Sequence, residues 1–106
     1  MVLSSPLSLA NRSRLSALAL KSRLPTMHLY RAHADAGGLM TYGPNLPAMH
    51  KRSAYYVARI LSGTPPGELP LERPTAFEFV INLKTAQTLG LSLPQGLLVR
   101  ADHIIR

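Results

Sequence analysis

Three short apolar runs of this chain stop abruptly at Ser, Gly, Pro or Asn and then pass into a helical pattern. They are residues Val2–Pro6, Gly37–Asn45 and Phe77–Asn82. Short β-prone runs that alternate with helices are typical of a sheet built from βαβ units. The sequence therefore predicts an α/β fold, and any ligand is expected at the carboxyl ends of the strands, where open α/β sheets bind their ligands.

Hydrophobic periodicity and turn residues predict the individual elements. Strands are expected over residues 1–4, 26–30, 39–42 and 75–81, and helices over 9–22, 31–36, 46–61 and 83–89, with a last helix from Pro94 that includes Ile104 and Ile105. Asn82 is expected to cap the helix 83–89 and Gly90 to end it. An Asn side chain accepts a hydrogen bond from a free N–H of the first turn, and Gly adopts a left-handed conformation at little cost.

The stretch of residues 63–74 holds four prolines and two glycines and shows little apolar periodicity. Such a composition predicts an extended surface linker. We therefore expect three parts: strand–helix repeats of an α/β lobe over residues 1–62, a linker over 63–74, and a C-terminal strand and helices over 75–106 that return to the lobes.

Two blocks of the sequence, Gly37–Pro44 and Phe79–Ala86, resemble the C-terminal part of ABC-transporter substrate-binding proteins. The family in question is the one with predicted tryptophan and tyrosine binders, and the resemblance covers nearly the whole chain. It implies a partial, truncated type I periplasmic-binding-protein fold. In that fold two Rossmann-like lobes, each with parallel strands flanked by helices, close around a cleft.

The same resemblance implies a function without catalysis: capture of a small solute, for example an amino acid, and its delivery to an ABC permease. Proteins of this family act in the periplasm at full length. A secretory signal is not expected here, because Asn11–Arg14 interrupts the first apolar stretch, so the chain made alone should stay in the cytoplasm. No apolar run approaches the roughly 20 residues that span a bilayer.

An excess of basic residues leaves other interpretations open. Twelve Lys and Arg face five acidic residues, giving a net charge of +7, a balance that suits nucleic acid. No more than two Lys or Arg are adjacent, so no specific nucleic-acid partner is expected. The alternatives to solute binding are a small basic cytoplasmic interaction module that binds nucleic acid, and a non-functional gene fragment. A mitochondrial-type presequence also stays open, because no acidic residue precedes Asp35.

Residues typical of catalysis or metal binding form no recognisable motif. The five acidic residues are far apart in sequence, cysteine is absent, and the four histidines lack a metal-ligand spacing. Gly37 and Gly38 precede a predicted strand, whereas a phosphate-binding loop follows one. We therefore expect no catalytic residue, no metal and no cofactor.

The predicted strand ends carry the candidate ligand-binding residues, which are Ser4, Ser5, Tyr30, Tyr42 and Asn45. Hydroxyl and amide groups can hydrogen-bond a solute, and a Tyr ring can stack on an aromatic one. Arg31 could pair a carboxylate. Structural roles compete with these: the serines could cap a helix, the tyrosines could be core residues at strand ends, and Arg31 could be solvated.

Overall fold

A four-stranded sheet with the order β1-β2-β3-β4 organises the chain. The computed structural model describes all 106 residues. The strands are β1 (Met27–His28), β2 (Met40–Pro44), β3 (Phe77–Asn82) and β4 (His103–Ile105). The pairs β1–β2 and β3–β4 are parallel, whereas β2 and β3 are antiparallel. The expected parallel pairing therefore holds for the two outer pairs and is wrong for the central one, because the chain leaves the sheet after β2 and re-enters it from the same end.

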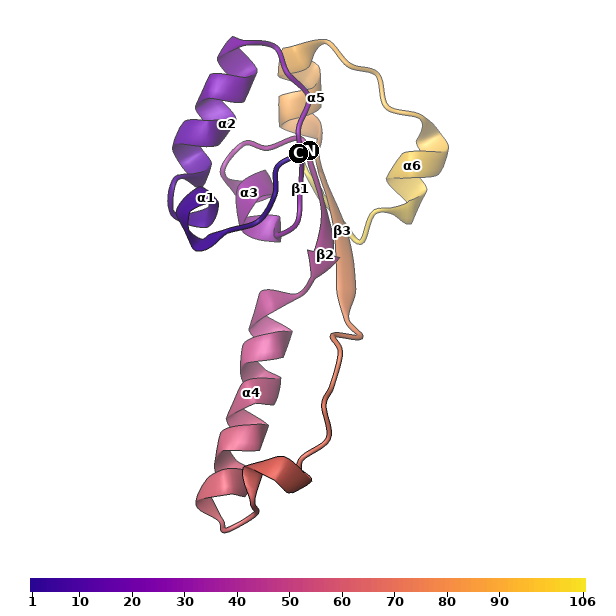
Figure 1. Cartoon of the computed structure of the whole chain (residues 1–106). Coiled ribbons are helices and arrows are strands. Elements are labelled where there is room, and N and C mark those ends of the chain that lie inside the picture. The colour runs from indigo at the N-terminus through magenta and orange to yellow at the C-terminus, as the bar shows by residue number, and fades with distance from the viewer.

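Six α-helices accompany the sheet. They are α1 (Pro6–Ala10), α2 (Arg12–Lys21), α3 (Arg31–Asp35), α4 (Leu46–Leu61), α5 (Leu83–Leu89) and α6 (Gln95–Arg100), and a single 3-10 turn follows α4 at Pro66–Glu68. Helices α1 to α3 lie on one side of the sheet and α6 on the other (Figure 1). None of these helices combines the length and the hydropathy that a bilayer-spanning segment needs.

The hydrophobic core is small and lies where α3 and α5 meet the two central strands. Its buried apolar residues are Ala34, Leu39, Val80, Ile81 and Ala86. A buried amide connects these elements, since the Asn82 side chain donates to the carbonyl oxygen of Ala34 at 2.9 Å and accepts from the Thr85 N–H at 3.1 Å. One side chain therefore caps α5 and holds β3 against α3.

Residues 46–76, called the arm below, project away from the remaining residues, called the body (Figure 1). The molecule measures 56 × 30 × 19 Å, and its radius of gyration is 17.0 Å, against about 13 Å for a compact domain of this length. The arm consists of α4 and an extended return segment. Tyr56 donates to the Pro70 carbonyl oxygen at 2.8 Å, and Arg52 Nε lies 2.7 Å from Glu72 Oε2. These contacts hold the return segment against the helix.

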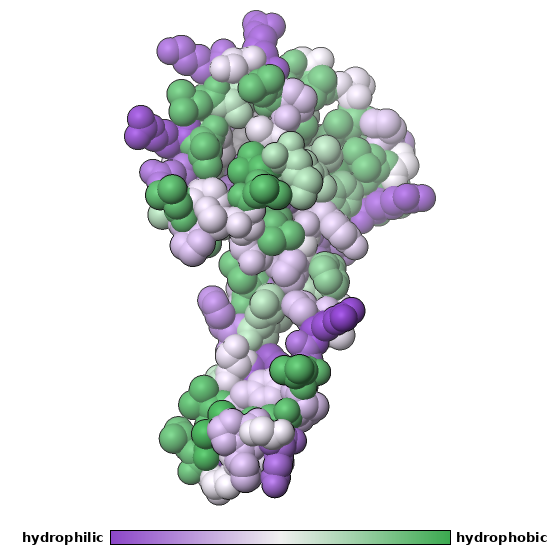
Figure 2. All heavy atoms as spheres, viewed as in Figure 1, coloured by the Kyte–Doolittle hydropathy of each residue, from purple (hydrophilic) through white to green (hydrophobic).

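Helix α4 is unusual because none of its sixteen residues is buried. Its apolar side chains Val57, Ile60 and Leu61 are 54%, 40% and 83% exposed. Figure 2 shows hydrophobic residues on the surface of both the broad body and the narrow arm. An amphipathic helix normally buries its apolar face, so the apolar face of α4 lacks a partner in this chain.

Most helix predictions are confirmed. Helices 46–61 and 83–89 have the predicted bounds, Asn82 caps α5, and Gly90 ends it in the left-handed conformation with φ 71°. The predicted helix 9–22 is divided at Asn11 into α1 and α2. Much of the linker region is extended, with the 3-10 turn at Pro66–Glu68 inside it. The division into 1–62, 63–74 and 75–106 stays a prediction.

Predictions at the two chain ends are wrong. Residues 1–4 form no strand, although the Val2 N–H donates to the Met27 carbonyl oxygen at 2.9 Å. The last helix ends at Arg100, and the residues after it pair with β3. Asp102 explains the change: its carboxylate accepts from the Phe79 N–H at 2.7 Å, and its own N–H donates to the Phe79 carbonyl oxygen at 2.8 Å. These bonds draw the chain onto the edge of the sheet.

Candidate functional site

A cavity of about 390 Å³ lies where β1 ends, β2 passes into α4 and β3 begins. Its volume falls in the range of small-molecule sites. The lining residues are Tyr30, Arg31, Asp35, Pro44, Asn45, Leu46, Pro47 and Glu78. The cavity therefore lies at the predicted edge of the sheet and at the junction of body and arm.

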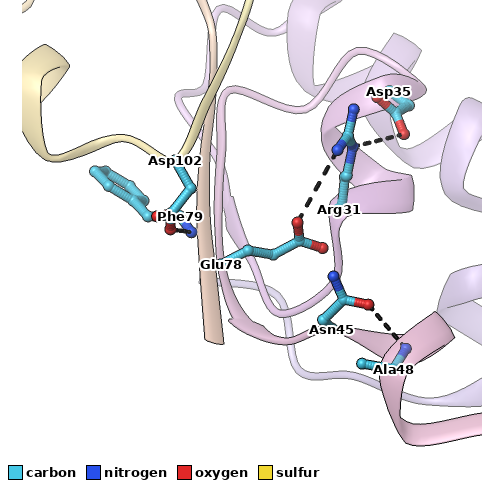
Figure 3. Close-up of polar contacts among 7 residues, drawn as sticks. All are labelled: Arg31, Asp35, Asn45, Ala48, Glu78, Phe79 and Asp102. Carbon is cyan, nitrogen blue, oxygen red and sulfur yellow. Dashed lines mark hydrogen bonds and ion pairs between the residues drawn. The ribbon is translucent and has the colours of Figure 1, made fainter. Parts of the chain in front are cut away.

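Three charged side chains meet at this cavity (Figure 3). Arg31 opens α3, and its Nε lies 3.6 Å from Asp35 Oδ2, one helical turn further on. Its Nη1 lies 4.0 Å from Glu78 Oε2. The side chains of Arg31 and Asp35 are 41% and 54% exposed, whereas that of Glu78 is only 17% exposed. The formal charge of the group is negative by one unit, and its most enclosed member is an acid.

The register of the sheet fixes the position of Glu78. Glu78 stands opposite Gly43, and Val80 stands opposite Thr41. Alternate residues of a strand share a face, so Glu78 faces α3 with Val80 and Asn82. Gly43 admits no side chain, because a Cβ there would overlap the carbonyl oxygen of Leu29. The backbone at Leu29 therefore passes close to Gly43, and Arg31 from α3 is the side chain that approaches Glu78.

Asn45 joins the cavity to the arm. Its side-chain oxygen accepts from the Ala48 N–H at 3.0 Å and caps α4 (Figure 3), and its own N–H donates to the Ala76 carbonyl oxygen at 3.0 Å. The Asn45 side-chain NH2 donates to no group of the chain. Asn45 can therefore cap the helix and still offer a donor to a solute.

The structure brings together two of the five predicted site residues, Tyr30 and Asn45, and Arg31 lies beside them. Ser5 caps α1: its Oγ accepts from the Ser8 N–H at 3.1 Å, and its N–H donates to Ser8 Oγ at 3.0 Å. Ser4 is exposed and precedes that cap. Both serines lie outside the cavity. Ser5 has the helix-capping role that competed with ligand binding, and a ligand contact by either serine stays a prediction.

Tyr42 lies on the opposite face of the sheet from Glu78. Its ring stacks on Phe77 with centroids 6.0 Å apart and meets Phe79 edge-on at 6.3 Å. The side chain is half exposed and does not line the cavity. Its predicted role in ligand binding stays a prediction.

Sequence reasoning missed Glu78 and Asp35 as cavity residues. Alternation along 75–81 does place Glu78 and Val80 on one face, and the register confirms this. What the sequence could not supply is the antiparallel neighbour, β2, and the helix α3 that brings Arg31 over that face. The i, i+4 spacing of Arg31 and Asp35 was the available signal for their pairing.

A second, more open cavity of about 760 Å³ lies between α4 and the return segment. Arg52 and Glu72 form an ion pair in this cavity, and hydrogen bonding to Arg52 lowers the pKa of Glu72 to about 2. The Arg52 guanidinium also lies 4.1 Å from the centre of the Tyr55 ring. No three of the His, Asp and Glu side chains gather closely enough to hold a metal ion. The first cavity is therefore the better candidate site, because its acids are only loosely paired.

Comparisons with known proteins agree with the α/β fold. The sequence model of one family, described as "ABC transporter substrate binding protein", matches residues 8–105. A conserved domain protein from Vibrio cholerae is similar in structure with a TM-score of 0.84 and 25% identity, over 90% of this chain and 32% of that chain. No curated protein sequence matches the chain.

Two further solved structures are similar. One is an ABC domain from Streptococcus pneumoniae in complex with L-Trp, with a TM-score of 0.90 and 22% identity over 98% of this chain and 35% of that chain. The other is the ligand-free, open structure of CD0873 from Clostridium difficile, a substrate binding protein with adhesive properties, with a TM-score of 0.57 and 15% identity over 96% of this chain and 34% of that chain. The chain thus spans about a third of the length of each of these structures.

Proposed function

The chain belongs to the ABC transporter substrate binding protein family, and from this premise we propose that it is part of a unit that captures a small solute without catalysing a reaction. The predicted α/β fold, a partial periplasmic-binding-protein fold, agrees with the structure and its neighbours. Solute capture itself goes beyond family membership and needs a site.

The position of the 390 Å³ cavity is the observation that carries the proposal. Tyr30, Arg31 and Glu78 reach it from the body, while Leu46 and Pro47 reach it from the first turn of the arm. A solute held there touches both parts of the molecule. Its binding energy can therefore fix the arm relative to the body, as in domain closure around a ligand.

We propose an amino acid as the first solute to test, because the relative from Streptococcus pneumoniae was solved with L-Trp and Tyr30 supplies an aromatic wall. For the complete protein, we propose capture in the periplasm and delivery to an ABC permease. Both follow from family membership alone.

Isothermal titration calorimetry on the purified chain tests the proposal. The solutes are L-tryptophan, L-tyrosine, L-leucine and, as a neutral polar solute, D-glucose. Loss of an aromatic contact costs about 0.5–1.5 kcal/mol in addition to the lost buried area, so Tyr30→Ala should weaken binding about tenfold. Tyr42→Ala is the matched control, because it removes the same ring from the opposite face of the sheet, and binding should stay within about twofold.

Two results would contradict this proposal. One is the absence of binding for every solute of the panel to a folded chain. The other is a larger loss from Tyr42→Ala than from Tyr30→Ala, which would place the site on the aromatic face formed by Tyr42, Phe77 and Phe79.

A further inference from the structure

We propose that the cavity selects its solute by a protonated amine, that Glu78 receives this amine, and that a carboxylate on the solute is not required. This inference rests on the proposed function and names the class of solute that the site takes. It follows from the charge balance and the burial of the three charged side chains.

Arg31 is the one cation that lines the cavity, and two carboxylates face it. Its guanidinium lies 3.6 Å from Asp35 and 4.0 Å from Glu78. A solute carboxylate bound to Arg31 would compete with both acids and would add a third negative charge. A protonated amine instead balances the excess negative charge of the group.

Glu78 is the acid best suited to receive the amine. Its side chain is the most enclosed of the three, at 17% exposed. It accepts no hydrogen bond from the chain, and its contact with Arg31, at 4.0 Å, is too long to be one. The carboxylate therefore keeps acceptor positions that a donor on the solute can fill. An ammonium group offers three donors from one small charged centre.

Neighbouring side chains fit the same chemistry. Tyr30 lines the same cavity as Glu78, and an aromatic ring attracts a cation placed over its face. Of the remaining lining residues, Pro44, Leu46 and Pro47 are apolar and Asn45 is a neutral amide, so none adds a second cation. The site therefore offers an anionic receptor and an apolar wall, and its free neutral donor, the Asn45 amide, adds no positive charge to hold a carboxylate.

Calorimetry with matched solutes tests the inference on the unmodified chain. The best-binding amino acid of the panel is compared with its decarboxylated and its deaminated analogue. For L-tryptophan these are tryptamine and 3-indolepropionate. Tryptamine should bind within about threefold of L-tryptophan, and 3-indolepropionate should bind at least about tenfold more weakly, as expected for loss of a charge-assisted hydrogen bond.

Substitution of the acid completes the test. Glu78→Gln keeps the shape of the side chain and should weaken both amines about tenfold or more while leaving 3-indolepropionate unchanged or tighter. Glu68→Gln removes an acid from the 3-10 turn of the arm, outside the cavity, and should change none of the three affinities.

The outcomes separate the inference from the proposed function. If 3-indolepropionate binds as tightly as tryptamine, or D-glucose binds best, the amine inference is wrong while solute capture stands. If a folded chain binds no solute of the panel or of the matched set, the proposed function itself is wrong. Weaker binding of all three solutes to Glu78→Gln alone would also overturn the assignment of Glu78, because it would indicate a structural role.

Discussion

Arg23 adopts a left-handed backbone conformation at the end of α2, a position that favours glycine. It follows the C-cap of α2 with φ 52°, and the bonds around it are those of a Gly-type stop: Leu24 N–H donates to the Ala19 carbonyl oxygen at 2.8 Å, and Arg23 N–H donates to that of Leu20 at 3.0 Å. A left-handed conformation costs a residue with a Cβ about 1 kcal/mol. The chain thus keeps a small strain at this turn.

We expect Arg23→Gly to raise the free energy of unfolding by about 0.5–1 kcal/mol, because glycine adopts this conformation without strain. Urea unfolding followed by circular dichroism measures the change. Gly90→Ala is the reciprocal control: Gly90 has φ 71° and open space around it, so added strain is the main effect and a loss of similar size is expected. A loss of stability in Arg23→Gly would show that the arginine side chain contributes more than its backbone costs.

A buried pair of histidines is the second feature at this scale. The rings of His28 and His33 stack with centroids 4.5 Å apart, and none of their four nitrogens has a hydrogen-bond partner in the chain. A Cβ at Gly38 would lie 2.9 Å from the His28 ring, so the stack depends on that glycine. Burial, with a smaller contribution from His33, lowers the pKa of His28 to about 4.

Because the pKa of His28 is lower in the folded chain than the roughly 6.5 of an unfolded one, the unfolded chain binds more protons between these values. The contribution of His28 to the free energy of unfolding is therefore at its full value above about pH 6.5, and it is lost as the pH falls toward about 4. We expect a loss of about 1–3 kcal/mol over this range, measured by urea unfolding at several pH values. His28→Phe keeps a flat ring and should reduce the dependence; an unchanged slope would assign it to other groups.

Among the elements, the sequence predicted correctly those whose bounds depend on contacts within the segment itself. Helices α4 and α5 have their predicted bounds because each begins at an Asn cap and carries its period within the segment. The fate of residues 103–105 depends instead on Asp102 reaching Phe79, more than twenty residues earlier. The antiparallel step between β2 and β3 likewise depends on the path of the arm. Neither the Asp102–Phe79 bonds nor the antiparallel pairing can be predicted from the residues of one segment alone.

The same division explains which site residues could be found. Tyr30 and Asn45 were predicted because each lies at the carboxyl end of a predicted strand. Glu78 lines the cavity because it pairs with Gly43 of β2 and because Arg31 lies opposite it on α3. Its place in the cavity could therefore not be predicted from its own segment. Tyr42 also ends a predicted strand, but the one-residue alternation of the sheet turns it to the other face.

The shape of the whole molecule sets how its parts should unfold. The buried apolar residues all belong to the body, and the arm is held together mainly by polar contacts between α4 and the return segment. Exposed ion pairs contribute little to stability, typically about 0–1 kcal/mol. The arm therefore has much less burial to stabilise it than the body, although the two are continuous through β2 and β3.

We expect the arm to unfold at a lower urea concentration than the body, and the four tyrosines can separate the two. Tyr55 and Tyr56 belong to α4, whereas Tyr30 and Tyr42 belong to the body. Near-ultraviolet dichroism of Tyr30→Phe/Tyr42→Phe reports the arm, and that of Tyr55→Phe/Tyr56→Phe reports the body. The arm signal should be lost gradually and first, because local unfolding is easiest where few apolar contacts are buried. Coincident, cooperative transitions in both variants would contradict this, and would mean that the apolar face of α4 is covered in solution.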